Sequence, residues 1–395
     1  MAGTRSRKRG SCLMRLNKIV ATVCLLLPSV EVAQSTASRV PQLIPRTRRE
    51  REQNYENLHR VFLSVQVTTP SGQAADNLKQ SDFNLFVDHQ RHEMSSFQSE
   101  TKDSVTTPVR VVLVVDALNN SSGRVASYRK AITKYVQSGS GSLSNPTSIA
   151  VLSEHGTARS SFSTDRVAVL RYLNELSGNV QTMSCRDTTY ERAQESYDRD
   201  PNPRLECLDR LFNSSIAALN SIGESLVLSR SKLHRPVRTI IIWLGRGWPL
   251  LNEPGFMPDT PEIEESFHRN FVSISGALTE AQVTLNAVAS NALIPLSGKK
   301  LANSYFVQGV PADKEAVAAG LSLQAFAWQS GGIVLSSTKD ITAQIAGCVA
   351  DAQSYYLLSF DYSPAPKFGE RHLLDVTVGI SGLATRTRTL YYAEQ

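Results

Sequence analysis

The stretch Val109–Asn120, read as VRVVLVVDALNN, constrains the fold more than any other part of this sequence. Five consecutive apolar residues, Val111–Val115, end at Asp116, and a polar loop follows. A short apolar run without alternation predicts a strand that is buried on both faces, as in a parallel sheet covered by helices. Open α/β sheets bind their ligands at the carboxyl ends of the strands. Asp116 is therefore the first candidate functional residue, and the alternative is an aspartate that only caps the next turn.

The central part of the chain alternates strands with helices. Further strands are predicted at Ser148–Leu152, Val237–Leu244, VTLNAVA and GGIVLS. Helical spacing of apolar residues predicts helices at Val125–Val136, from about Asp165, at Leu205–Ile222, and over 263–279, 313–329 and 340–353. This alternation predicts a doubly wound, mostly parallel, Rossmann-like α/β domain over residues 107–354.

The two ends of the folded region have a different pattern. Residues 59–100 contain short extended runs, and residues 355–395 contain three extended runs separated by Pro/Gly-rich turns without helices. Each segment is too small to bury much apolar surface alone. We therefore expect the N- and C-terminal segments to pack together as a small accessory β module.

Residues 1–37 have the layout of an export signal. A basic segment is followed by the apolar run Ile19–Leu27 and then by small residues, with cleavage expected after Ala33 or Ala37. The run is short for a membrane span, and the alternative is an uncleaved anchor. Residues 38–58 are polar and Arg-rich and are expected to form a linker or arm. The sequence thus predicts an exported protein, periplasmic or extracellular, without a stable membrane span after signal cleavage.

The charge of the chain argues against a nucleic-acid partner. The formal net charge is +6, but residues 1–33 hold six basic residues against Glu31, and their removal leaves +1. A nucleic-acid-binding protein of this size normally carries a strong basic excess on its folded part.

Three cysteines lie beyond the signal segment. Export allows disulfides to form, and Cys185 and Cys207 bracket a polar insert that a disulfide between them would close. Cys348 lies in a helical stretch of small residues and is expected to be a buried packing residue.

Several segments, taken in order, resemble the bacterial von Willebrand factor A-related family. They are SVQVTTPSGQAADNLKQSDFNLFVDHQRHEMSSF, VVLVVDALNN, SFSTDRVAVLRYL, TIIIWLGRG and QSYYLLSFDYSPAPKFGERHLLDVTV. The likeness covers residues 60 to 392. It implies a Rossmann-like domain that, in adhesive relatives, binds a divalent cation through Asp-x-Ser-x-Ser together with a Thr and a second Asp. Oxygen ligands of this kind suit Mg²⁺.

This chain departs from that ligand pattern at several positions. Asp116 matches the first aspartate, but Leu118 and Asn120 fall on the two serines. The resemblance also implies Thr-Asp-Gly after the later strand, where this chain has Gly-Arg-Gly, with Arg246 at the position of the carboxylate. We therefore predict that the Arg246 guanidinium replaces the metal and pairs with Asp116, and the alternative is a solvated loop charge.

The resemblance and its departures predict a non-catalytic protein-interaction module with a degenerate metal-ion-dependent adhesion site and no cofactor. An unidentified protein partner is expected at the carboxyl edge of the sheet, through Asp116, Asn119, Asn120, Arg246 and Trp248. One alternative is a Mg²⁺-dependent adhesin that uses Asp116 and Asn120 as ligands. A second alternative is a hydrolase whose site is not recognisable from the sequence.

Overall fold

The computed structural model describes eight stretches of the chain, all within one compact unit that spans residues 52–395. They are residues 60–100, 109–177, 202–231, 237–248, 261–289, 321–336, 340–362 and 369–393. The predicted export signal, the predicted linker and Cys185 lie outside the described residues, and the side chain of Cys207 does as well.

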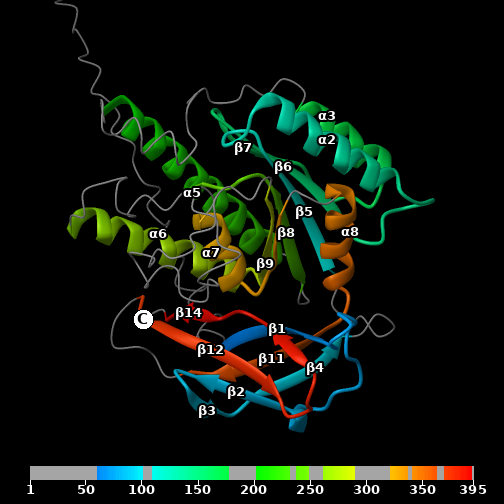
Figure 1. Ribbon diagram of the computed structural model, residues 1–395, viewed down its shortest axis with the longest axis vertical. Helices are drawn as coiled ribbons and strands as arrows, with labels where there is room; N and C mark the ends of the chain where they lie inside the picture. The colour runs from blue at the N-terminus through cyan, green and yellow to red at the C-terminus, as the bar shows by residue number, and fades with distance from the viewer. Residues whose placement is uncertain are drawn as a thin grey trace, which may run out of the picture. The chain divides into compact units, whose positions relative to one another are not determined.

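The largest sheet has six strands in the order β10-β9-β8-β5-β6-β7 (Figure 1). Their bounds are β5 Val109–Asp116, β6 Thr147–Ser153, β7 Gly156–Arg159, β8 Arg238–Leu244, β9 Val283–Ala289 and β10 Val334–Ser336. Neighbouring strands pair in parallel, except that the edge strand β7 runs antiparallel to β6. The order is that of a doubly wound Rossmann-like sheet, which confirms the predicted fold class.

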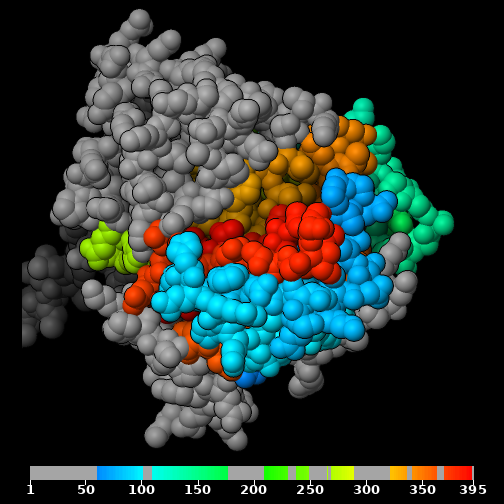
Figure 2. Space-filling view, turned by 60° about the horizontal axis from the view of Figure 1, so that its bottom comes forward, coloured from blue at the N-terminus to red at the C-terminus, as the bar shows by residue number. Residues whose placement is uncertain are grey.

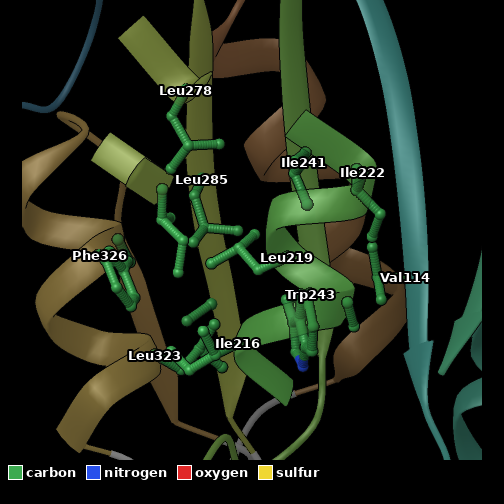
Figure 3. Packing of buried hydrophobic residues seen from close by; sticks show 14 of the residues in the cluster. Val114, Ile216, Leu219, Ile222, Ile241, Trp243, Leu278, Leu285, Leu323 and Phe326 are labelled. Carbon is green, nitrogen blue, oxygen red and sulfur yellow. The ribbon is translucent and has the colours of Figure 1, made fainter. Parts of the chain in front are cut away.

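Helices cover both faces of this sheet. One face packs against α5, α6 and α7, and the other packs against α2, α3 and α8. The helices span α2 Ser122–Gln137, α3 Arg166–Ser177, α5 Asn202–Ser231, α6 Pro261–Glu280, α7 Leu321–Gln329 and α8 Ile341–Asp351. Figure 3 shows the first of these two cores, where α5 residues such as Leu219 and Ile222 meet Val114 and Trp243 of the sheet.

The central strands are buried for the reason that their sequence suggests. Every residue of Val111–Val115 is 0 % exposed, because successive side chains enter the cores on alternate faces. Burying five such side chains contributes roughly 1.5–3 kcal/mol each before the entropy of ordering is counted. The adjacent strand β8 is likewise buried along its whole length.

Two small antiparallel sheets complete the described part. Their strand orders are β13-β1-β11-β4 and β14-β12-β2-β3. The bounds are β1 Arg60–Thr68, β2 Phe83–Val87, β3 Gln90–His92, β4 Ser96–Glu100, β11 Tyr355–Asp361, β12 Arg371–Val378, β13 Ala384–Arg386 and β14 Leu390–Tyr392, with a 3-10 turn at Gln80–Asp82. The two sheets share one apolar core, to which both ends of the folded region contribute.

The accessory module therefore contains strands from both ends of the chain, as expected. β1 pairs with β11, and β2 pairs with β12. Figure 2 shows the same intermingling on the surface, where the blue N-terminal segment lies against the red C-terminal segment. The last extended run differs from the prediction, because it is divided into β13 and β14, which pair with strands of different sheets.

None of the helices within the described residues is long and apolar enough to cross a membrane.

Candidate functional site

The candidate site lies where the strand order of the large sheet reverses. β5 lies between β6, the next strand in the sequence, and β8, which comes later in the chain. Ligands of doubly wound sheets bind outside the carboxyl ends of the strands at such a switch point. Asp116 ends β5, and the segment 245–248 follows β8, so the predicted candidates lie at the carboxyl edge of the sheet.

The Asp116 side chain is fully buried and is surrounded by hydrogen-bond donors. The Asn119 backbone N–H donates to Asp116 Oδ1 at 2.9 Å, and Asn119 Nδ2 donates to Oδ2 at 3.0 Å. The Trp243 indole Nε1 donates to Oδ2 at 3.1 Å. Burial raises the pKa of Asp116 to about 6, because the loss of hydration outweighs these hydrogen bonds, which lower the pKa.

The two asparagines after Asp116 hold the loop in place. Asn119 Nδ2 also donates to the Ser215 hydroxyl on α5 at 2.9 Å. Asn120 Nδ2 donates to the Asp116 carbonyl oxygen at 2.8 Å, and Asn120 Oδ1 accepts a hydrogen bond from the Tyr128 hydroxyl at 3.2 Å. Both ends of the Asn120 amide are therefore occupied, so this residue acts in the structure of the loop.

Arg246 does not pair with Asp116, and that prediction is wrong. Side chains alternate between the two faces of a strand, so Gly245 lies on the face that Asp116 shares with Trp243, and Arg246 lies on the other face. A Cβ added at Gly245 would be 2.6 Å from the Asp116 Cβ, which shows how closely β8 approaches the carboxyl group. Arg246 instead lies on the α2 side, where its charge interacts with Arg124 and Tyr128.

Trp248 does not present its side chain to a partner, which corrects a second prediction. Its side chain is 0 % exposed and packs on Trp243, with ring centroids 5.3 Å apart. Its carbonyl oxygen accepts a hydrogen bond from the Ser322 N–H at the start of α7. Trp248 therefore belongs to the apolar core on the α5 side of the sheet.

Of the five predicted contact residues, two keep accessible surface. Asp116 and Asn120 are buried, as Trp248 is, so direct contact of a partner with these side chains is contradicted as well. Asn119 and Arg246 are half-buried, and their role in partner binding stays a prediction.

The described residues at this edge do not fit a Mg²⁺ ion. Mg²⁺ requires near-octahedral oxygen ligands. The groups directed at the Asp116 carboxylate are N–H donors, the Asn120 amide oxygen is already an acceptor for Tyr128, and Leu118 is buried and apolar. Within the described residues no group of three or more His, Cys, Asp or Glu side chains could hold a metal ion.

Trp243 takes part in this site in a way that was not predicted from the sequence. Its ring belongs to the core on the α5 side of the sheet, and its indole N–H reaches the Asp116 carboxylate. The signal was present in the spacing. Once β5 and β8 are aligned in parallel, Trp243 lies beside Val114. Val114 is two residues before Asp116 and on the same face of the sheet.

The strand order and its switch point decide the fold. It is a doubly wound α/β fold with one antiparallel edge strand, consistent with the von Willebrand A-like fold that the sequence resemblance implies. No family model matches the sequence, and no curated protein matches it.

Solved structures with a related arrangement include three proteins of low sequence identity. The conserved hypothetical protein BatB from Bacteroides thetaiotaomicron matches with 11 % identity and a TM-score of 0.35, over 63 % of this chain and 100 % of BatB. Human COPII-coat protein Sec24c matches with 7 % identity and a TM-score of 0.32, over 75 % of this chain and 46 % of Sec24c.

The pilus adhesin SpaC from Lactobacillus rhamnosus GG, in its open conformation, matches with 10 % identity and a TM-score of 0.31, over 84 % of this chain and 41 % of SpaC. This chain thus spans less than half the length of Sec24c and of SpaC.

Proposed function

We propose that this chain is an exported, non-catalytic protein-interaction module whose von Willebrand A-like domain has a degenerate metal-ion-dependent adhesion site. One observation supports this proposal most directly. The N–H groups of Asn119 and Trp243 donate hydrogen bonds to the Asp116 carboxylate oxygens, which a metal ion would bind in an intact site.

The burial of Asp116 also supports a non-catalytic role. A general base or a nucleophile must reach its substrate, and the Asp116 side chain is 0 % exposed. Among the described residues at the same edge, Asn119 and Arg246 are half-buried and carry polar or positively charged groups. Such groups suit recognition of a partner surface better than bond cleavage.

Metal titration of the purified protein tests the degenerate site. We expect calorimetric titration with MgCl₂ and with MnCl₂ to give the same heats for the wild-type protein and for Asp116→Asn. A saturable isotherm that disappears in Asp116→Asn would instead establish the divalent-cation-dependent adhesin.

Partner capture tests the binding edge. Ser122 is exposed at the start of α2, and Ser144 is exposed before β6, near the opposite edge of the same sheet. We expect Ser122→Trp to lose a partner that the wild-type protein captures by cross-linking from the envelope or the external medium, and the matched variant Ser144→Trp to retain it. Equal capture by both variants would refute binding at the carboxyl edge.

A further inference from the structure

Arg246 carries a positive charge that nothing in the described part of the chain neutralises. Its side chain is half-buried, and its Nε is buried without a hydrogen-bond partner. Within the described residues it makes no hydrogen bond or ion pair. Guanidinium groups withdrawn from water are normally paired, because burial of an unpaired charge or donor costs free energy. Accordingly, burial is the main cause that lowers the pKa of Arg246.

A second arginine without a partner lies next to it. Arg124 is in the first turn of α2, is half-buried, and makes no hydrogen bond or ion pair with any described residue. Arg246 comes two residues after β8, and Arg124 lies in the first turn of the helix that follows β5. Because β5 and β8 are parallel neighbours, both arginines lie at the same edge of the sheet, and the charge of Arg124 further lowers the pKa of Arg246. Tyr128 is the other described group whose charge acts on Arg246, and no carboxylate of the described residues acts on it.

Other arginines of the described chain have the acidic partner that Arg124 and Arg246 lack among the described residues. Arg60 pairs with Asp361 at 2.7 Å, and Arg386 pairs with Asp351 at 2.6 Å. Two adjacent cations without a counter-charge repel each other, and an anion placed between them would relieve this repulsion. The start of α2 also leaves room, because a Cβ added at Gly123 would meet no atom within 4 Å.

We propose that Arg124 and Arg246 form a binding site for a carboxylate of the partner protein, supplied by an Asp or Glu side chain. The inference rests on the proposed function and names the chemistry that its binding edge recognises. A guanidinium presents its donors in a planar fork that matches the two oxygens of a carboxylate.

The neighbouring charges favour one acidic side chain over a polyanion. Lys134 on the same helix is 3.4 Å from Asp340, and Arg129 donates to the Asn174 side chain. Nucleic acids and anionic membranes require a broad basic surface. The site instead concentrates two charges at the edge where β5 and β8 end.

Fluorescence polarisation on the full chain tests the site. The probe is a fluorescein-labelled Gly-Glu-Gly-Glu-Gly peptide, and its counterpart carries Gln in place of Glu. We expect the Glu peptide to bind and the Gln peptide not to bind. We expect Arg124→Gln and Arg246→Gln each to weaken binding about tenfold or more, since a hydrogen bond to a charged group contributes about 1.5–3 kcal/mol.

Two control variants separate this site from general charge. Arg246→Lys keeps the charge and loses the fork, and should weaken binding less than Arg246→Gln does. Lys130→Gln removes an exposed cation from the same helix and should leave the affinity within about twofold. Equal binding of the two peptides, an equal loss in Lys130→Gln, or no binding of the Glu peptide would overturn the inference. Competition by inorganic phosphate at lower concentration than the unlabelled Glu peptide would also overturn it, in favour of a phosphate site.

The outcome is distinguishable from failure of the proposed function. If Ser122→Trp loses the captured partner while Arg124→Gln and Arg246→Gln retain it, the binding edge stands and the carboxylate site falls. If Ser122→Trp retains the partner, the proposed function itself falls.

Discussion

At the scale of single residues, face alternation decides the chemistry of the switch point. Asp116 and Gly245 lie on one face of the sheet and Arg246 on the other, so the Asp116 carboxyl group accepts hydrogen bonds from N–H groups and has no cation as a partner among the described residues. From the sequence, the carboxyl edge of the large sheet and its residues could be predicted, with the exception of Trp243. The sequence did not predict the pairing, because the expected Asp116–Arg246 contact required both side chains on the same face.

The raised pKa of Asp116 makes stability depend on pH. Between the ordinary value of 3.8 and about 6, the unfolded carboxyl group is ionised while the folded one keeps its proton, so the free energy of unfolding falls as pH rises through this window. The total loss is about 3 kcal/mol. We expect urea denaturation from pH 4 to pH 7 to show this decrease in the wild-type protein, beyond any decrease in Asp116→Asn.

Asp116→Asn is also expected to be less stable overall, because its amide NH₂ would face donors from Asn119 and Trp243. The difference in slope with pH, rather than the stability at one pH, is therefore the test. Parallel profiles for the two proteins would show that Asp116 titrates normally in the fold.

At the scale of elements, continuous apolar runs were the reliable signal. Val111–Val115 and the run in β8 were predicted as buried strands because they lack alternation, and both lie in the middle of the sheet. The last C-terminal run was harder to predict. Its sequence predicts one strand, but three residues between β13 and β14 take the chain from one small sheet to the other. Local sequence does not encode a change of partner strand.

The turn after α7 approaches β9 closely, so a side chain at Gly332 should lower stability. A Cβ added at Gly332 would overlap the backbone carbonyl oxygen of Leu285 in β9. Backbone atoms cannot move aside as a flexible side chain can, so we expect Gly332→Ala to lower the free energy of unfolding by about 3 kcal/mol.

Gly347 inside α8 provides the matched control, since an added Cβ there meets no atom within 4 Å. Gly347→Ala should raise stability by about 0.5–1 kcal/mol, because alanine is the better helix former. Thermal and urea denaturation of both variants check the pair, and equal effects of the same sign would contradict the close approach of Gly332 to β9.

At the scale of the whole described molecule, arginines connect the large sheet to the small antiparallel sheets. Arg238 at the start of β8 is buried, donates to the Ala352 carbonyl oxygen at 3.1 Å, and lies 4.2 Å from the ring centre of Tyr355. Arg386 of β13 makes two hydrogen bonds to Asp351 at the end of α8. These contacts join parts that the sequence predicted separately, and long-range pairing of this kind leaves no local signal.

A double-mutant cycle measures the Arg386–Asp351 contact. Its side chains are each 27 % exposed, and both carboxylate oxygens are bonded, so we expect a coupling energy of about 1–2 kcal/mol between Arg386→Met and Asp351→Asn. The Arg269–Glu265 pair has the same 2.6 Å separation, but its side chains are 63 % and 68 % exposed. Its coupling energy should not exceed about 0.5 kcal/mol, because water screens it. Equal couplings in the two cycles would show that burial does not set the strength of the Arg386 contact.

The pairing of β1 with β11 has a consequence for the order in which the chain matures. Arg60 and Asp361 are 301 positions apart, so a ribosome releases the first strand long before it has made the neighbour of that strand. During synthesis β1 remains unpaired until β11 has been made. An unpaired apolar strand edge favours aggregation, and pairing of strands far apart in the sequence is slow. The doubly wound sheet can assemble meanwhile from contiguous sequence. We therefore expect the accessory module to fold last. A chain that lacks the final few dozen residues would leave β1 without its partner strand β11.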